Sequence, residues 1–287
     1  MLVGVIDIGS NTTRLLVAEV SSGRPSPRLE RRHFLTPEAS GSQQGLCDLV
    51  ERQAAVAREF GAEELVVAGT ASLRQLRSAR SLDRVCERAG AGGLRVLSAA
   101  QEARLAFLGA TACEWGELPD TVGVADVGGG STQIVVGAPG SEPHWWASRP
   151  VGSRNLTRRA QLSDPPSRDQ IGAARNAAAR RLVGVEPPRC GQALAVGGGT
   201  SSLRRISGGS LDRHSIAGML ERLQRQPSIE VAADLGLAPE RVRLLPAALA
   251  VLEAVCELLP EPLRVARGGI REGLALERAL ASGAEVG

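Results

Sequence analysis

The stretch VIDIGSNTTRLL occupies residues 5–16 and decides the fold that we expect for this chain. It starts with apolar residues typical of a buried strand, places a carboxylate at Asp7, and turns through small residues into a second apolar run. A second stretch, VADVGGGSTQIV at residues 124–135, repeats this order with Asp126 in the place of Asp7. The sequence therefore predicts two strand–turn–strand hairpins, each with an aspartate where its first strand ends.

The repeat keeps one constant spacing of 119 residues, the distance from Asp7 to Asp126. That spacing is far too long for a solenoid and indicates two domains of one architecture. We expect the domains to span 1–118 and 119–287, with a linker near 114–121 and with a last helix able to pack back on the first domain.

Alternating helical and strand patterns follow each hairpin and predict an α/β fold with a mixed sheet in each domain. The expected helices cover 43–60, 72–89, 100–110, 169–183, 211–224, 239–258 and 270–281. The expected short strands cover 65–68, 94–97, 193–196 and 263–266.

Composition excludes several classes of protein. The chain has 287 residues, of which 43% are hydrophobic, and this supports two packed cores. All 34 basic residues are arginine, so a Walker A loop, which needs lysine, is excluded. The arginines are spread along the chain and tyrosine is absent, so we expect no nucleic-acid partner. The apolar runs are too short for a membrane span and the start lacks a basic leader, so we predict a cytoplasmic protein without a membrane partner.

The aspartate and glycines of each hairpin suit a phosphate held with a metal ion. Glycines let backbone N–H groups face an anion, whereas a bare carboxylate would repel it. Asp7 and Asp126 are therefore candidate ligands for Mg²⁺ held against a phosphate. The alternative is an aspartate that only accepts hydrogen bonds from its own turn.

Two further glycine stretches are AVGGGTSSL at 195–203 and ARGGIREGL at 266–274. The first follows a predicted strand and opens a helix, a geometry that favours phosphate binding. Neither fits the dinucleotide fingerprint or the nucleophile elbow of hydrolases. Together the four stretches predict a polyanionic phosphate ligand in a cleft between two domains.

Six segments in order, DIGSNTTRL, GTASLRQLR, QEARLAFLG, DVGGGSTQIVVG, AVGGGTSSL and GGIREGL, resemble the exopolyphosphatase and guanosine pentaphosphate phosphatase family. The resemblance covers nearly the whole chain. It implies two RNase H-like domains of the actin-like ATPase superfamily, facing each other across a cleft. It also implies Mg²⁺-dependent release of terminal phosphate from inorganic polyphosphate or guanosine pentaphosphate, either of which would be the partner.

The resemblance implies roles for individual residues. Glu102 would be the general base for the attacking water, and Arg74 would reach the phosphates. Asp7 and Asp126 would lie near the metal. The phosphate-binding residues would be Ser10, Asn11, Thr12, Arg14, Gly128, Gly129, Gly130, Ser131, Thr132, Gly198, Gly199, Thr200 and Ser201.

Several positions depart from the family pattern. Gln101 and Gln133 stand where similar proteins have glutamates, Arg267 stands where they have an aspartate, and Asn155 displaces an arginine. We expect these changes to strengthen phosphate binding and to weaken metal binding and turnover. They support a second hypothesis, a weakly active or inactive sensor of polyphosphate or guanosine polyphosphates. An actin-like ATPase or small-molecule kinase is the third, and a homodimer is one option for an oligomeric state that the sequence leaves open.

Overall fold

The computed structural model describes residues 1–9, 12–34, 43–70, 73 and 79–283. It divides the chain into a first unit, Met1–Cys113 with Gly268–Gly287, and a second unit, Glu114–Arg267. The second unit thus begins five residues before residue 119, where we expected the second domain to begin, and it ends at Arg267. The last helix, α12 (Ile270–Ala281), belongs to the first unit because its buried apolar residues pack in that unit's core.

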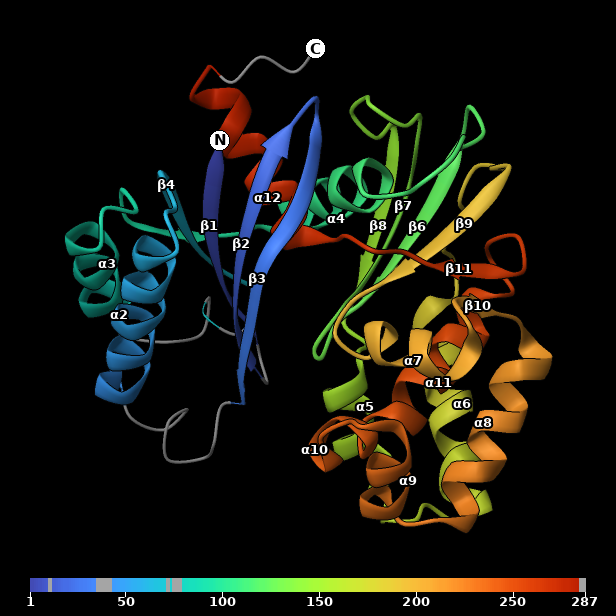
Figure 1. Cartoon of the computed structure of the whole chain (residues 1–287). Helices are drawn as coiled ribbons and strands as arrows, with labels where there is room; N and C mark the ends of the chain where they lie inside the picture. Colours follow the sequence, from blue (N-terminus) through green and yellow to red (C-terminus); the bar gives the residue numbers. More distant parts are fainter. Residues whose placement is uncertain (10–11, 35–42, 71–72, 74–78, 284–287) are drawn as a thin grey trace. The chain divides into compact units, whose positions relative to one another are not determined.

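The first unit contains a five-stranded mixed sheet in the order β3-β2-β1-β4-β5 (Figure 1). β1 pairs antiparallel with β2, β2 antiparallel with β3, and β4 and β5 run parallel to β1. The strands are β1 (Leu2–Ile8), β2 (Thr12–Ser21), β3 (Arg24–Phe34), β4 (Glu64–Gly69) and β5 (Leu94–Val96).

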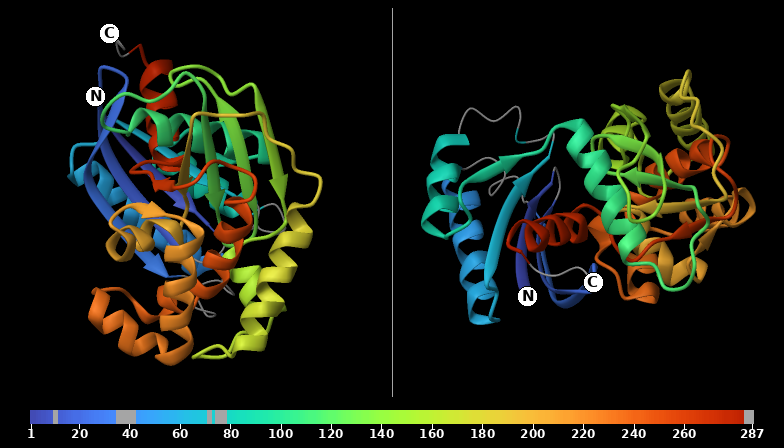
Figure 2. Two further views of the ribbon diagram at one scale, coloured as in Figure 1. Left: turned by 90° about the vertical axis from the view of Figure 1, so that its right-hand side faces the viewer. Right: turned by 90° about the horizontal axis from the view of Figure 1, so that it is seen from above.

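Helices cover both faces of this sheet. Strand residues alternate between the faces, so Ile6 and Ile8 join a core with α2 (Gln43–Glu59) and α3 (Ala79–Arg88). Val3 and Val5 point the other way and pack with α12 and with α4 (Ala99–Ala112), and α12 lies beside β1 and β2 (Figure 2).

The helices α4 and α12 cross at very close range because glycines line their contact. A methyl group added at Gly109 would lie 1.9 Å from the carbonyl oxygen of Gly269, and one added at Gly273 would lie 2.2 Å from that of Leu105. The backbones therefore touch where side chains would normally separate two helices. This crossing joins the middle of α4 to the start of α12, and both helices pack on the same face of the sheet as Val5.

The second unit has a six-stranded sheet in the order β10-β11-β9-β6-β7-β8. Apart from β10 it repeats the first sheet, with β6 and β7 as the hairpin, β8 as the third antiparallel strand, and β9 and β11 parallel to β6. The strands are β6 (Val122–Val127), β7 (Thr132–Gly137), β8 (Trp145–Arg149), β9 (Gln192–Val196), β10 (Ser210–Leu211) and β11 (Leu263–Val265).

One large core joins this sheet to the helices of the second unit, and it includes Ala125 and Val127 of β6. The helices are α5 (Ser153–Arg159), α6 (Arg168–Leu182), α7 (Thr200–Ser207), α8 (Arg213–Arg225), α9 (Ser228–Leu235), α10 (Pro239–Val242) and α11 (Leu245–Val255). The prediction of one helix over 239–258 was wrong, because the chain breaks it at Arg243 and Leu244 into α10 and α11. α5 and α9 were not predicted. Of the helix expected over 72–89, the structure describes α3 from Ala79, and 74–78 lie outside the described residues.

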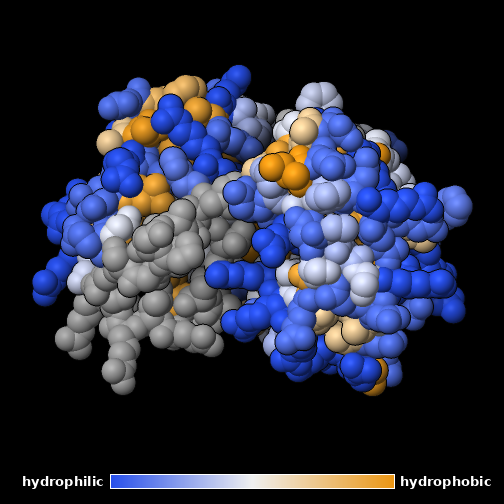
Figure 3. All heavy atoms as spheres, turned by 90° about the horizontal axis from the view of Figure 1, so that it is seen from below, coloured by the Kyte–Doolittle hydropathy of each residue, from blue (hydrophilic) through white to orange (hydrophobic). Residues whose placement is uncertain are grey.

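The surface drawn in colour in Figure 3 is mostly hydrophilic, with small separate hydrophobic areas, as is usual for a folded domain surface. Among the described residues, none of the helices has both the length and the apolar character that crossing a membrane requires.

Candidate functional site

The two hairpins place their aspartates in equivalent positions. Asp7 is paired with Arg14 across the first hairpin, and Asp126 is paired with Gln133 across the second. In each case the glycine two residues after the aspartate donates its N–H to a carbonyl three residues later, at 3.0 Å in both turns. The predicted repeat is therefore present in the strand register and in the turn itself.

Asp7 lies in a strongly charged setting. It shares a face of the sheet with Val5, and its Oδ1 atom is buried with no hydrogen-bond partner in the described part of the chain. Burial raises the pKa of Asp7, and the nearby guanidinium groups of Arg14 and Arg271 act against that rise. The Arg14 Nε atom also donates to the Thr12 hydroxyl at 3.4 Å, so both predicted residues adjoin the turn.

Arg271 and Glu272, in the first turn of α12, were quoted in a glycine motif but given no role by the sequence analysis. Arg271 pairs with Glu30 at 3.2 Å and with Glu272 at 3.5 Å. Burial lowers the pKa of Arg271, but Glu272, Glu30 and Asp7 outweigh that effect and the net shift is upward. The sequence did contain a signal for this site, the glycine pair Gly268–Gly269 just before the start of α12. In the folded chain, Arg271 in the first turn of α12 lies near Asp7.

Glu102 lies in the first turn of α4 and is only 3% exposed. Leu105, one turn further along α4, packs in the same core as Val5, so α4 covers the sheet face that carries Asp7. The structure thus places both predicted residues on one side of the first sheet.

Gln101 has a structural role that the sequence analysis did not assign. Its side-chain oxygen accepts the Ser98 N–H at 2.9 Å, while the Ser98 hydroxyl accepts the Gln101 N–H at 3.2 Å. Such a capping box accepts glutamine or glutamate equally. Gln101 is therefore a helix-capping residue, and the glutamate that similar proteins have at this position could form the same cap.

In the second unit, the phosphate-loop candidates meet at one sheet edge. β6 and β9 are parallel neighbours, so Asp126, at the end of β6, lies beside the loop that follows Val196. A methyl group added at Gly197 would lie 2.3 Å from the carbonyl oxygen of Val127 and 2.7 Å from Asp126 Oδ1. Gly197 also has φ +110°, so a glycine is required on both counts.

The loop Gly128–Ser131 is anchored through its carbonyl groups. The Gly128 carbonyl accepts the N–H of Ser153 at 2.9 Å, and the Gly129 carbonyl accepts those of Arg154 and Asn155 at 2.9 and 3.0 Å. These donors belong to the first turn of α5, so that helix start holds the loop instead of binding an anion. Asn155 adds a side-chain bond to the Gly130 carbonyl at 3.1 Å, which gives this departure from the family pattern a structural function.

Gln133 is buried opposite Asp126. Its Nε2 atom donates to the hydroxyl oxygens of Ser131 at 3.1 Å and Ser148 at 3.4 Å. Thr132 is fixed separately by donating its hydroxyl to the Val151 carbonyl at 2.6 Å. Gln133 therefore supplies neutral polar contacts next to a carboxylate.

The third glycine loop, Gly197–Gly199, leads into the first turn of α7. The Thr200 and Ser202 hydroxyls are buried and have no hydrogen-bond partner among the described residues, which suits a loop that binds an external anion. Arg241 of α10 donates to the Gly198 carbonyl and so fixes the loop from behind. The predicted Ser10, Asn11 and Arg74 lie outside the described residues, as does the side chain of Ser201.

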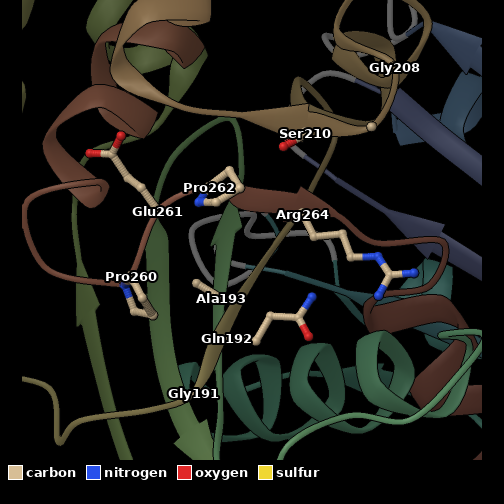
Figure 4. Close-up of a pocket in the computed structure, with 10 residues that line it drawn as sticks. Gly191, Gln192, Ala193, Gly208, Ser210, Pro260, Glu261, Pro262 and Arg264 are labelled. Carbon is tan, nitrogen blue, oxygen red and sulfur yellow. The ribbon is translucent and has the colours of Figure 1, made fainter.

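A pocket of about 390 Å³ in the second unit lies away from these loops. It is lined by Gln192, at the opposite end of β9 from Gly197, and by Gly208, Pro260, Glu261 and Arg264 (Figure 4). Half of its lining residues are glycine or proline, and it contains none of the predicted site residues.

A mixed sheet of this strand order, found twice and with its aspartates at equivalent strand ends, defines an actin-like ATPase fold. The model of the Ppx/GppA phosphatase family matches residues 42–282, and the chain belongs to that family. Exopolyphosphatase 1 of Mycobacterium tuberculosis is 27% identical over 97% of this chain and 88% of its own length. The guanosine-5′-triphosphate,3′-diphosphate pyrophosphatase of Vibrio atlanticus is 28% identical over 96% of this chain and 59% of its own length. The crystal structure of the Aquifex aeolicus family member matches with a TM-score of 0.81 and 23% identity, covering 99% of both chains.

Proposed function

We propose that this chain is a phosphohydrolase that releases terminal phosphate from inorganic polyphosphate or guanosine pentaphosphate. The observation on which the proposal rests is the pair of matching Asp–turn hairpins, with Glu102 buried in a helix that covers the first of them. Its family relatives include proteins named as an exopolyphosphatase and as a guanosine polyphosphate pyrophosphatase.

The proposed reaction needs few groups. A water oxygen forms a bond to the terminal phosphorus while the bridging P–O bond breaks, and the water proton passes to the Glu102 carboxylate. The shortened phosphate chain leaves with the electron pair of the broken bond. Backbone N–H groups of the glycine loops and the Arg14 guanidinium would hold the phosphate oxygens and stabilise their charge.

We also propose Mg²⁺ as cofactor. The buried Oδ1 of Asp7 lacks a hydrogen-bond partner in the part of the chain that the structure describes, and only a glycine at position 197 leaves the Asp126 carboxylate uncrowded. Among the described residues no group of three or more acidic, histidine or cysteine side chains forms a metal cage. These residues fit Mg²⁺, which keeps several waters and needs one or two carboxylates beside substrate phosphates. When bound, the ion would neutralise phosphate charge. A cleft that brings Asp7 and Asp126 to one site stays a prediction.

A second candidate function, binding with little turnover, is favoured by Gln133, a buried neutral residue opposite Asp126. Phosphate release should be measured with polyphosphate, guanosine pentaphosphate and ATP, each with and without Mg²⁺. We expect Mg²⁺-dependent release from one or both of the first two. Tight binding of either without release would instead support the sensor, and release from ATP alone would support the ATPase alternative.

A further inference from the structure

A cluster of arginines in the second unit includes Arg267, which replaces the aspartate of similar proteins, and two arginines to which the sequence analysis gave no role. It consists of Arg204 on α7, Arg264 on β11 and Arg267 directly after β11, which we call the arginine cluster. Arg264 pairs with the carboxylate of Glu114, which is almost fully buried. Arg204 lies close enough to Glu114, Arg264 and Arg267 for their charges to affect its pKa.

Glu114 cannot balance the charge of the arginine cluster. One of its oxygens pairs with Arg264 Nε at 3.2 Å, and the other accepts the backbone N–H of Arg267 at 3.2 Å. In the described part of the chain, the guanidinium groups of Arg204 and Arg267 form no ion pair with a carboxylate. Burial, and then the neighbouring Arg267, lower the pKa of Arg204. Like charges gathered at a partly buried place without a matching acid are costly, and an anion would relieve that cost.

Trp115 orients one of these charges. The guanidinium carbon of Arg267 lies 5.0 Å from the centre of the Trp115 ring, within cation–π range. The Trp115 ring is 71% exposed, and Arg267 is exposed as well, so the guanidinium is both held in place and accessible to a ligand.

The arginine cluster lies beside the predicted phosphate loops of the same unit. Arg204 is in the second turn of α7, the helix that the loop Gly197–Gly199 opens. β11 runs parallel to β9, and the Ala266 N–H donates to the Ala195 carbonyl at 3.0 Å. Arg267 therefore emerges at the sheet edge where that loop begins.

We propose that the arginine cluster binds phosphate groups of a long polyphosphate chain that lie beyond the terminal phosphate. This inference rests on the proposed function and names polyphosphate as the preferred substrate. Guanidinium forks match phosphate oxygens, and a row of them suits a ligand with many phosphates. A nucleobase would require an aromatic face, and Arg267 already covers one face of Trp115.

The nearby pocket does not share this function. Arg264 is the arginine that lines it, and its side chain extends away from Glu261 toward the side where Gln192 also points (Figure 4). Its Nε atom is committed to Glu114. The anion site that we propose is therefore formed by the arginine cluster near the loop Gly197–Gly199 and not by this pocket.

The test compares Arg267→Gln and Arg204→Gln with the control Arg225→Gln, which removes an exposed arginine of α8 in the same unit. Affinities for long-chain polyphosphate, tripolyphosphate and guanosine pentaphosphate are measured by calorimetry without Mg²⁺, so that no turnover is needed. We expect each cluster variant to weaken long-chain binding about 3- to 10-fold. The lower value corresponds to the loss of an exposed ion pair, and the upper value to the loss of a hydrogen bond between charged groups. Tripolyphosphate binding and the control should stay unchanged.

Three results would overturn the inference. Long-chain affinity could be unchanged in both cluster variants, it could fall no more than tripolyphosphate affinity, or only guanosine pentaphosphate binding could weaken. Melting temperatures of the variants identify any that fail to fold. Arg267→Gln should disturb folding least, because Arg267 is exposed. If wild type binds long chains without hydrolysing them, the proposed function fails while this inference is still tested.

Discussion

The hairpin ends of β1 and β6 have the same backbone and different charges. Each carries an aspartate in the same register and the same 3.0 Å turn hydrogen bond. Beside Asp7 lie Arg14 and Arg271, whereas opposite Asp126 lies Gln133, an amide bound to two serines. A repeated fold thus gives two carboxylates of unequal character, because an arginine lies opposite Asp7 and a neutral amide lies opposite Asp126.

The helices that follow the equivalent strands β5 and β11 make a second comparison. α4 follows β5 and α12 follows β11, and each buries a glutamate in its first turn. Glu272 accepts the Gly269 N–H at 2.8 Å and pairs with Arg271, so it has a capping function. In α4 the capping function belongs to Gln101, the residue before Glu102.

The largest expected effect comes from this pair of glutamates. Glu102→Gln keeps the shape and removes the base, so we expect phosphate release to fall about 10²-fold or more. Glu272→Gln should instead lower stability by about 1–3 kcal/mol, because it breaks the buried ion pair with Arg271, although glutamine can still form the cap. Initial rates of phosphate release measure the first effect, and thermal unfolding measures the second; both are recorded for both variants. Wild-type turnover in Glu102→Gln would remove Glu102 from the mechanism.

A change that makes the first hairpin resemble the second tests the role of its charge. Arg14→Gln should raise the KM for polyphosphate about tenfold, because one charge-assisted contact to phosphate is lost. Arg24→Gln, at the exposed start of β3, is the matched control and should be neutral. Equal KM values for wild type and Arg14→Gln would show that Arg14 does not bind the phosphates and that the charge difference between the hairpins has no such function.

The reverse change, Gln133→Glu, adds a carboxylate opposite Asp126. Hard cations prefer charged oxygen ligands, so the Mg²⁺ concentration for half-maximal activity should fall several-fold. Ser131 and Ser148 can then donate their hydroxyl protons to the new carboxylate. Gln192→Glu, at the opposite end of β9, serves as control. If Gln133→Glu loses activity at every Mg²⁺ concentration, position 133 is not beside the metal and the sensor hypothesis gains support.

The smallest effect concerns the attachment of α12 to the first unit. Burial raises the pKa of Glu277, but its hydrogen bonds from Arg95 and Arg104 outweigh this and leave that pKa below its ordinary value. The stabilisation is therefore complete above the ordinary value of 4.5 and is lost as pH falls through the lower folded value. Glu277→Gln should lower the free energy of unfolding by about 1–2 kcal/mol at neutral pH.

Denaturant unfolding at several pH values measures this loss. The difference between wild type and Glu277→Gln should shrink as the solution is acidified below that value. Glu221→Gln breaks an exposed pair on α8 and should cost less than about 0.5 kcal/mol at all pH values. A difference for Glu277→Gln that is independent of pH would contradict the ionic contribution.

The sequence by itself determined the duplication, the two aspartates and the strand–turn–strand elements. These features are local, because a short apolar run, an acid and a set of turn glycines are visible within a dozen residues. It also located the helix at 270–281 to the residue, since a glycine pair precedes it and its apolar spacing is regular. It could not find α5, a seven-residue helix whose start is fixed by bonds to the distant loop Gly128–Ser131.

Only the tertiary structure decided which distant residues meet. α12 follows the last strand of the second unit, yet it packs in the first, because its glycines allow backbone contact with α4. That packing brings Arg271 to Asp7, and the parallel pairing of β6 and β9 brings Gly197 to Asp126. The apolar pattern of a helix shows that one face will be buried, but the surface that buries it is chosen by shape and contact across the folded chain.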